Sequence, residues 1–186
     1  MLVIIDLETT SADPGEAHIL EIGAVAWSGE TFSSLCNPGF STQGALSDYQ
    51  KALDINGITP EEILSAPLAE AVQEAFRKWL RGQSGGGPLI ILGGWNSSRY
   101  DSVILDRVGW IPRRYWGIDV MTLAQEIMGN RGALPRSKYG DWKWPRLSEG
   151  MDFFEVLPRG ELHRALTDAI ATKEILERVL GIREAS

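Results

Sequence analysis

Residues 3–10 read Val-Ile-Ile-Asp-Leu-Glu-Thr-Thr, and this stretch decides the fold class. The short apolar run predicts a buried β-strand that ends in two acids. Because side chains alternate between the two faces of a strand, Asp6 and Glu8 are expected to project from the same face. Adjacent carboxylates repel each other unless a cation neutralises them, and Mg²⁺ or Mn²⁺ prefers such oxygen ligands. On its own, however, an Asp-x-Glu pair is more often a solvated strand end.

The segments after this strand predict a meander followed by alternating helices and strands. Residues 18–27 and 31–38 are strand candidates joined by a short turn, which favours antiparallel pairing. Farther along, Thr59 is expected to cap a helix that has Pro60 at its first position and Glu62 completing a capping box. Other expected elements are a helix over 68–80 ended by Gly82, a flexible connector over 84–87, a strand over 88–92, and helices over 101–108, 120–128, 148–157 and 162–180.

Length, composition and charge limit the class of protein. The 186 residues, 44% hydrophobic and 23% charged, suit one globular domain spanning 1–186. Because no apolar run reaches the length of a membrane span and Cys36 is the single cysteine, we expect an intracellular, cytoplasmic protein. The net charge of −7 counts against simple electrostatic binding of DNA, so the local distribution of charge matters more than the total.

A third acid, Asp101, stands in a different context. Residues 96–108 predict a helix capped by Ser97 or Ser98, with Asp101 in its first turn. The helix dipole alone favours a carboxylate there, so a structural acid and a functional one are equally open at this position.

A fourth acid, Asp168, belongs to the last predicted helix. It lies beside an apolar stripe, and its helical neighbours Ala165, Ala171 and Thr172 are all small. A carboxylate at the edge of a core needs a partner, and small neighbours leave room for one. His163 stands at the start of this helix, where it is expected to move, although a lone histidine is more often structural.

Three segments in this order resemble the DnaQ-like DEDDh exonucleases, a family that includes polymerase proofreading subunits, RNase T and oligoribonuclease. The segments are VIIDLETT at 3–10, ILEIGAV at 19–25 and HRALTDA at 163–169. Asn-Gly-Ile-Thr at 56–59 and Asp119 are also similar to positions of the family, and the likeness covers nearly the whole chain. The resemblance implies an α/β, ribonuclease H-like fold: a mixed five-stranded sheet, three antiparallel strands then parallel ones, with helices on both faces.

The resemblance also implies a set of site residues. The four metal-binding acids of the family, which hold two divalent ions, Mg²⁺ or Mn²⁺, match Asp6, Glu8, Asp101 and Asp168. Asp6 and Asp168 are expected to hold the ion beside the attacking water. Asp6 would also reach the second ion, and Glu8 and Asp101 would complete the cluster. His163 matches the histidine that activates water.

Substrate contacts are expected at Thr9, Thr10 and Ser97, near two departures from the family pattern. Ser97 replaces an asparagine usual in the family. Ser11-Ala12 replaces a glycine and a bulky apolar residue that wedges between the last bases. The wedge is therefore expected to be small, so the terminal base needs another stacking surface.

Residues 131–150 are predicted from their own composition to grip the substrate. This segment has five basic and two acidic residues, a local net charge of +3, with three interleaved aromatic residues. Basic groups can follow phosphates while aromatic faces stack on bases, so we expect a flap beside the acids with Arg136, Lys138 and Trp142 as contacts. In the alternative, Trp142 and Trp144 pin the loop to the core, and this is favoured more for Trp144, which precedes a proline.

These features together predict a 3′-to-5′ exonuclease that hydrolyses phosphodiester bonds at the 3′ end of single-stranded nucleic acid, with DNA slightly favoured over RNA. An exoribonuclease of the RNase T or oligoribonuclease type is the alternative within enzymes. A non-catalytic binding module that serves a polymerase or another partner is the alternative from a different class. Retention of all four acids and the histidine counts against the module. Any polymerase association is expected in trans, and no membrane partner is expected.

Overall fold

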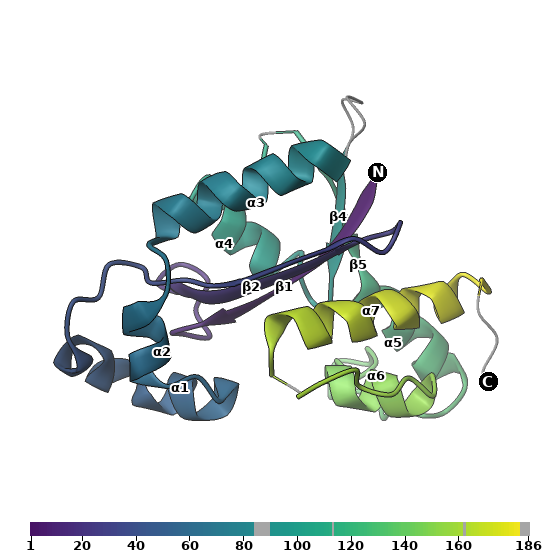
Figure 1. The fold of residues 1–186 in the computed structure, drawn as a ribbon. Helices are drawn as coiled ribbons and strands as arrows, with labels where there is room; N and C mark the ends of the chain where they lie inside the picture. The colour runs from purple at the N-terminus through teal and green to yellow at the C-terminus, as the bar shows by residue number, and fades with distance from the viewer. Residues whose placement is uncertain (84–89, 113, 162, 183–186) are drawn as a thin grey trace.

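The computed structural model describes residues 1–83, 90–112, 114–161 and 163–182 (Figure 1). The connector predicted over 84–87 lies outside these residues. Within the described ranges, no helix is both long enough and apolar enough to cross a membrane.

A mixed sheet of five strands forms the centre of the molecule. In chain order the strands are β1 (Leu2–Thr9), β2 (Ile19–Ala26), β3 (Thr31–Leu35), β4 (Ile91–Gly94) and β5 (Trp116–Asp119). Across the sheet their order is β3-β2-β1-β4-β5. The β1–β2 and β2–β3 pairs are antiparallel, whereas the β1–β4 and β4–β5 pairs are parallel. This confirms the predicted sheet, with three antiparallel strands followed by parallel ones.

Helices cover both faces of the sheet. One face carries α3 (Ala69–Gln83) and α4 (Asp101–Arg107), and the other side carries α5 (Val120–Asn130), α6 (Leu147–Phe153) and α7 (Ala165–Val179) (Figure 1). Near the end of the sheet toward which β1 runs lie the 3-10 helix η1 (Gln43–Tyr49) and the short helices α1 (Gln50–Asn56) and α2 (Pro60–Ser65). The sequence did not predict η1 or α1.

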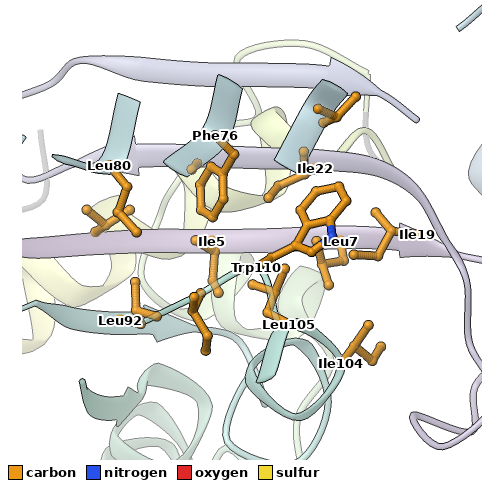
Figure 2. Packing of buried hydrophobic residues seen from close by; sticks show 14 of the residues in the cluster. Ile5, Leu7, Ile19, Ile22, Phe76, Leu80, Leu92, Ile104, Leu105 and Trp110 are labelled. Carbon is orange, nitrogen blue, oxygen red and sulfur yellow. The ribbon is translucent and has the colours of Figure 1, made fainter. Parts of the chain in front are cut away.

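Alternation along β1 divides the core into two clusters. Ile5 packs in the cluster beneath α3 and α4, where Figure 2 shows it on the same side of the sheet as Phe76. Ile4 belongs to the opposite cluster, together with residues of α5, α6 and α7. The same period of two places Asp6 and Glu8 on the Ile4 face, toward α7, as the sequence predicted.

Several helix boundaries test the sequence-based expectations. The capping box is confirmed, because Thr59 N–H donates to Glu62 Oε2 (2.8 Å) and Glu62 N–H donates to Thr59 Oγ1 (3.2 Å). Gly82 does not end α3, which continues to Gln83, since a glycine in an exposed last turn costs a helix only about 1 kcal/mol. Other limits also differ from the prediction: α5 continues two residues further, to Asn130, α6 ends four residues earlier, and α7 begins three residues later, at Ala165.

The start of α4 also differs from the prediction. The helix begins at Asp101, and its N-cap is Tyr100, which makes no side-chain capping bond. Neither Ser97 nor Ser98 caps the helix. Ser98 Oγ instead binds Asp119 Oδ2 at 2.5 Å, which ties the turn before α4 to the end of β5.

Candidate active site

Three carboxylates converge at the carboxyl end of β1. Asp6 and Glu8 leave β1 on the face covered by α7, and Asp168 leaves α7 in its first turn. One carboxylate oxygen from each residue lies within 4.8 Å of the other two, so all three can bind one cation. The fold thus brings together acids from opposite ends of the chain.

The position of Asp168 depends on how α7 docks against β2. Gly23 permits a close approach, because a Cβ there would lie 2.2 Å from the backbone of Ala165. Glu21, which is 3% exposed, accepts from Arg164 Nε (3.0 Å) and Nη2 (3.0 Å) and from Ala165 N–H (3.3 Å). These contacts hold the start of α7 on the sheet, so the first turn presents Asp168 to β1. Sequence reasoning missed this pair, although one acid within the apolar run at 19–25 was a signal for it.

Asp101 reaches the end of β1 from α4. Pairing between β1 and β4 ends at Ile4 and Gly93, and beyond that point Leu7 N–H donates to Asp101 Oδ1 at 3.1 Å. The Asp101 side chain therefore replaces the next backbone acceptor of the sheet. Among neighbouring charges, Asp101 has the largest effect on the pKa of Asp6, so it lies close to the three-acid set without belonging to it.

Burial and the charges of neighbouring carboxylates raise the pKa values of all four acids. Burial is the largest cause in each case, and it raises the pKa of Glu8 to about 9, that of Asp101 to about 7 and that of Asp168 to about 6. The pKa of Asp6 is raised well above its ordinary value by burial and then by the charges of Asp101 and Glu8. Within the described residues, Asp168 Oδ1 is buried without a hydrogen-bond partner. A divalent cation would remove the repulsion and give this oxygen a partner, so the donor set fits Mg²⁺ or Mn²⁺.

His163 lies just before α7 and beside this cluster. It is exposed, and its backbone has a φ of 62°, a left-handed conformation that is uncommon for residues other than glycine. The charge and the backbone of His163 both lower the pKa of Asp168, although burial of Asp168 has the larger, opposite effect. The imidazole is therefore close to the acids while it remains open to solvent.

A cavity of about 700 Å³ opens beside the acids. Residues 7–12 form one wall, and α1 forms the other. On the α1 wall Ile55 is 56% exposed, and Asn56 Nδ2 donates to Thr9 O at 3.2 Å, which ties the two walls together. Helix α1 was difficult to predict from the sequence, because it has only seven residues and ends at the left-handed Gly57 (φ 63°).

The predicted substrate contacts Thr9 and Thr10 line this cavity, but their hydroxyls already have partners. The Thr9 hydroxyl contacts the Tyr100 hydroxyl, and both contact the carbonyl oxygen of Ser11. Thr10 Oγ1 accepts from His18 N–H at 2.9 Å. Tyr100, which the sequence did not single out, therefore braces the loop after β1. Contact between substrate and the two threonines remains a prediction.

Burial argues against a direct substrate contact by Ser97. The residue is 1% exposed, and its Cβ lies 2.7 Å from the place that a Cβ on Gly94 would occupy. Ser97 therefore packs inside the turn that leads to Asp101. Its neighbour Asn96, with a φ of 60°, lines the cavity instead, and among the described residues its buried Oδ1 has no hydrogen-bond partner.

The two tryptophans of segment 131–150 have the reverse of their predicted roles. The Trp142 ring packs on Gly129 of α5, where an added Cβ would be 2.3 Å from the ring, and the Arg136 guanidinium covers it at 3.9 Å. Trp142 thus pins the loop to the core, and Arg136 is occupied by the same contact. Trp144 is the open indole, at 54% exposure.

The same segment is attached to the residues that lead to Asp101. Trp95 Nε1 donates to Pro145 O at 3.0 Å, which joins the segment to the end of β4. Lys138 is exposed and lies over the exposed ring of Tyr139 at 4.8 Å. The segment therefore docks beside the site, although a grip on substrate remains a prediction.

The model of the RNase T type family, described as Exonuclease, matches residues 3–176. The chain belongs to this family. The match runs from β1 to α7 and includes all four acids and His163. This exonuclease domain is therefore a nuclease-type hydrolase with an acidic cluster at the carboxyl end of β1.

Two curated relatives cover nearly the whole of this exonuclease domain. Exonuclease DPD1, chloroplastic/mitochondrial, of Arabidopsis thaliana is 25% identical over 188 residues, which cover 96% of this chain and 55% of that protein. DNA polymerase III PolC-type of Caldanaerobacter subterraneus subsp. tengcongensis is 29% identical over 182 residues, which cover 96% of this chain and 11% of that protein. The chain thus spans about half of the first relative and a small part of the second.

Solved structures share the fold of this exonuclease domain. Escherichia coli exonuclease I in complex with a dT13 oligonucleotide has a TM-score of 0.67 at 18% identity, covering 98% of this chain and 41% of that one. Cell-death related nuclease 4 has a TM-score of 0.67 at 19% identity, covering 97% of this chain and 64% of that one. These likenesses confirm the predicted ribonuclease H-like fold.

Proposed function

We propose that this exonuclease removes nucleotides from the 3′ end of single-stranded nucleic acid, using two divalent ions, Mg²⁺ or Mn²⁺, and His163 as general base. The observation that carries the proposal is the convergence of Asp6, Glu8 and Asp168 within 4.8 Å, with Asp101 next to them. Two divalent ions in such a site supply charge stabilisation for the attacking and leaving oxygens of a phosphodiester.

Each acid has a distinct place in the proposed site. The charges of all three other acids raise the pKa of Asp6, so Asp6 is the central carboxylate and the one suited to serve both ions. Asp6 and Asp168 would hold the ion nearer His163. Glu8 and Asp101, which approach from the end of β1 and from α4, would complete the second position.

His163 is suited to take the proton of the attacking water. The residue lies beside Asp168 and is exposed, so a water molecule can reach its imidazole. The ion pair of Arg164 with Glu21 holds the neighbouring backbone in place. A positioned general base typically contributes about 10²- to 10⁴-fold to the rate.

The surroundings favour a single strand with a free end. The cavity of about 700 Å³ between residues 7–12 and α1 has the size of a ligand site, and Glu8 of the acidic cluster lines it. Ile55 offers the exposed apolar surface that the small Ala12 does not, so α1 can stack on the terminal base. The exonuclease I neighbour was solved with a DNA strand, which supports the slight preference for DNA. The PolC-type relative, in which the matching segment is part of the polymerase, supports an association with a polymerase.

The decisive experiment uses matched DNA and RNA strands that carry a label at the 5′ end. In Mn²⁺, trimming from the 3′ end gives a ladder of shortened labelled strands. We expect the ladder to disappear in excess EDTA and in the Asp168→Asn variant. Asp106→Asn is the matched control, because Asp106 is an exposed acid of α4 outside the site.

Each other outcome identifies a different function. Release of the labelled end nucleotide at once would contradict the 3′-to-5′ direction. Faster trimming of RNA than of DNA would favour the exoribonuclease alternative. Binding of both strands without cleavage in either metal would show a binding module.

A further inference from the structure

An arginine and a tryptophan form an exposed stack outside the cavity. The Arg99 guanidinium lies 4.4 Å from the centroid of the Trp144 ring. Trp144 is 54% exposed and Arg99 is also exposed, so the pair is open to solvent. Within the part of the chain that the structure describes, Arg99 forms no ion pair. Its charge is therefore available to an anionic ligand.

The pair is built on a rigid support. Trp95 Nε1 donates to Pro145 O at 3.0 Å, and the Trp95 ring packs on Gly150, where an added Cβ would lie 2.4 Å from it. On the other side, the Ser98 hydroxyl binds Asp119 at 2.5 Å. The residues next to each member of the stack are thus tied to the body of the protein, and the indole is presented with little loss of conformational freedom.

A second arginine–tryptophan pair, Arg136 with Trp142, differs from the Arg99–Trp144 stack in how its indole is packed. Arg136 covers Trp142 at 3.9 Å, but that indole packs on Gly129 and its loop is bonded to Gln125. Trp142 is partly buried against the core, and this packing explains it as an anchor. No comparable burial explains Trp144, since more than half of its surface remains in solvent.

The chemistry of the stack suits a nucleotide. A base can stack on an indole, and a guanidinium can bind the adjoining phosphate by charge-assisted hydrogen bonds. Arg99 precedes Asp101 by two residues, so their Cα atoms are at most about 7 Å apart. A strand whose end lies at the acids can therefore pass over this pair.

We propose that Arg99 and Trp144 form a second nucleotide subsite, which binds an upstream base and its phosphate of a single-stranded nucleic acid. The position of the subsite on the strand rests on the proposed function, whereas its binding chemistry does not. The subsite grips the part of the strand that is not being cleaved.

Binding of a fluorescein-labelled oligothymidylate of about ten nucleotides, followed by anisotropy in excess EDTA, tests the subsite without catalysis. We expect Trp144→Ala to weaken binding roughly 5- to 150-fold, the range expected for one lost base stack. Trp144→Phe should retain most of the affinity, because it keeps an aromatic face. Arg99→Ala should also weaken binding, and it should make affinity less dependent on salt. Trp116→Ala is the matched control, because Trp116 is 68% exposed and is the first residue of β5, at the end of the strand away from Asp119.

The outcomes separate this proposal from the proposed function. Wild-type affinity in Trp144→Ala, or an equal loss in Trp116→Ala, overturns the subsite. A loss as large for a labelled dinucleotide as for the longer strand also overturns it, because a dinucleotide spans the catalytic end alone. If the wild-type protein trims no strand in Mn²⁺ but these binding differences appear, the proposed function fails and the subsite stands.

Discussion

Replacing Glu8 by glutamine is expected to stabilise the metal-free protein while abolishing its nuclease activity. Glu8 is 8% exposed, and burial raises the pKa of its carboxyl from 4.5 to about 9, with Asp168 and Glu21 as the next causes. At pH 7 this carboxyl is ionised in the unfolded chain, but the folded state holds it protonated. Folding at pH 7 must therefore bind a proton, which costs free energy because this pH lies above the pKa of the carboxyl in the unfolded chain.

The size of the effect follows from the distance between the solution pH and the unfolded pKa. At pH 7 the unfavourable contribution of Glu8 is about 3 kcal/mol, at about 1.4 kcal/mol per pH unit. Glutamine keeps the shape of the side chain and does not ionise, so we expect a gain of about 1–3 kcal/mol after the neighbouring acids readjust. For a chain of this length that gain corresponds to a rise in Tm of roughly 3–10 °C.

The pH dependence has a defined sign. Because the folded pKa of Glu8 is raised, its favourable contribution is complete below about pH 4.5 and is lost as the pH rises through about 9. The wild-type free energy of unfolding in EDTA should therefore fall from pH 5 to pH 8, and the variant should fall less. Added Mn²⁺ should reverse the order, because it stabilises the wild type by binding the folded state.

Thermal denaturation of the wild type and of Glu8→Gln at pH 5 and pH 8, each with EDTA or with Mn²⁺, measures these stability differences. Glu74→Gln is the matched control, because Glu74 is exposed on α3, and its Tm should change little at either pH. A variant that is less stable than the wild type at pH 8 in EDTA would refute the reasoning. So would a stability difference that does not grow between the two pH values.

Three further predictions concern the proton transfer, the docking of α7 and the loop. His163→Ala should lower kcat by about 10²- to 10⁴-fold while the rise in Tm caused by Mn²⁺ is retained, and a variant with wild-type turnover would show a structural role. Arg164→Ala leaves the buried carboxylate of Glu21 without its ion pair, so the free energy of unfolding should fall by about 3 kcal/mol and kcat should also fall. Arg164→Lys should recover part of both losses, and an unchanged urea denaturation curve for Arg164→Ala would contradict this. Lys138→Gln should raise KM and reduce the salt dependence of kcat/KM with kcat nearly unchanged, whereas Arg136→Ala should loosen the loop and expose Trp142 to fluorescence quenchers.

The sequence by itself determined the parts of this protein that depend on local periodicity. The alternation in β1 placed Asp6 and Glu8 on one face, and the capping box located the start of α2. Small residues around Asp168 indicated space for a partner. The predictions for β1 and α2 are confirmed, because strand alternation and helix capping depend only on neighbours along the chain. The partner of Asp168 stays a prediction.

The tertiary structure alone decided which faces meet. That Asp101 accepts from Leu7 depends on where β4 stops pairing, and that Arg164 meets Glu21 depends on how closely α7 approaches β2. The tryptophans of the loop were assigned in reverse for the same reason. Trp142 is partly buried because Gly129 of α5 leaves room for its ring, and no pattern within residues 131–150 indicates that room. Contacts between distant segments are set by complementary surfaces, which exist only once the elements have packed.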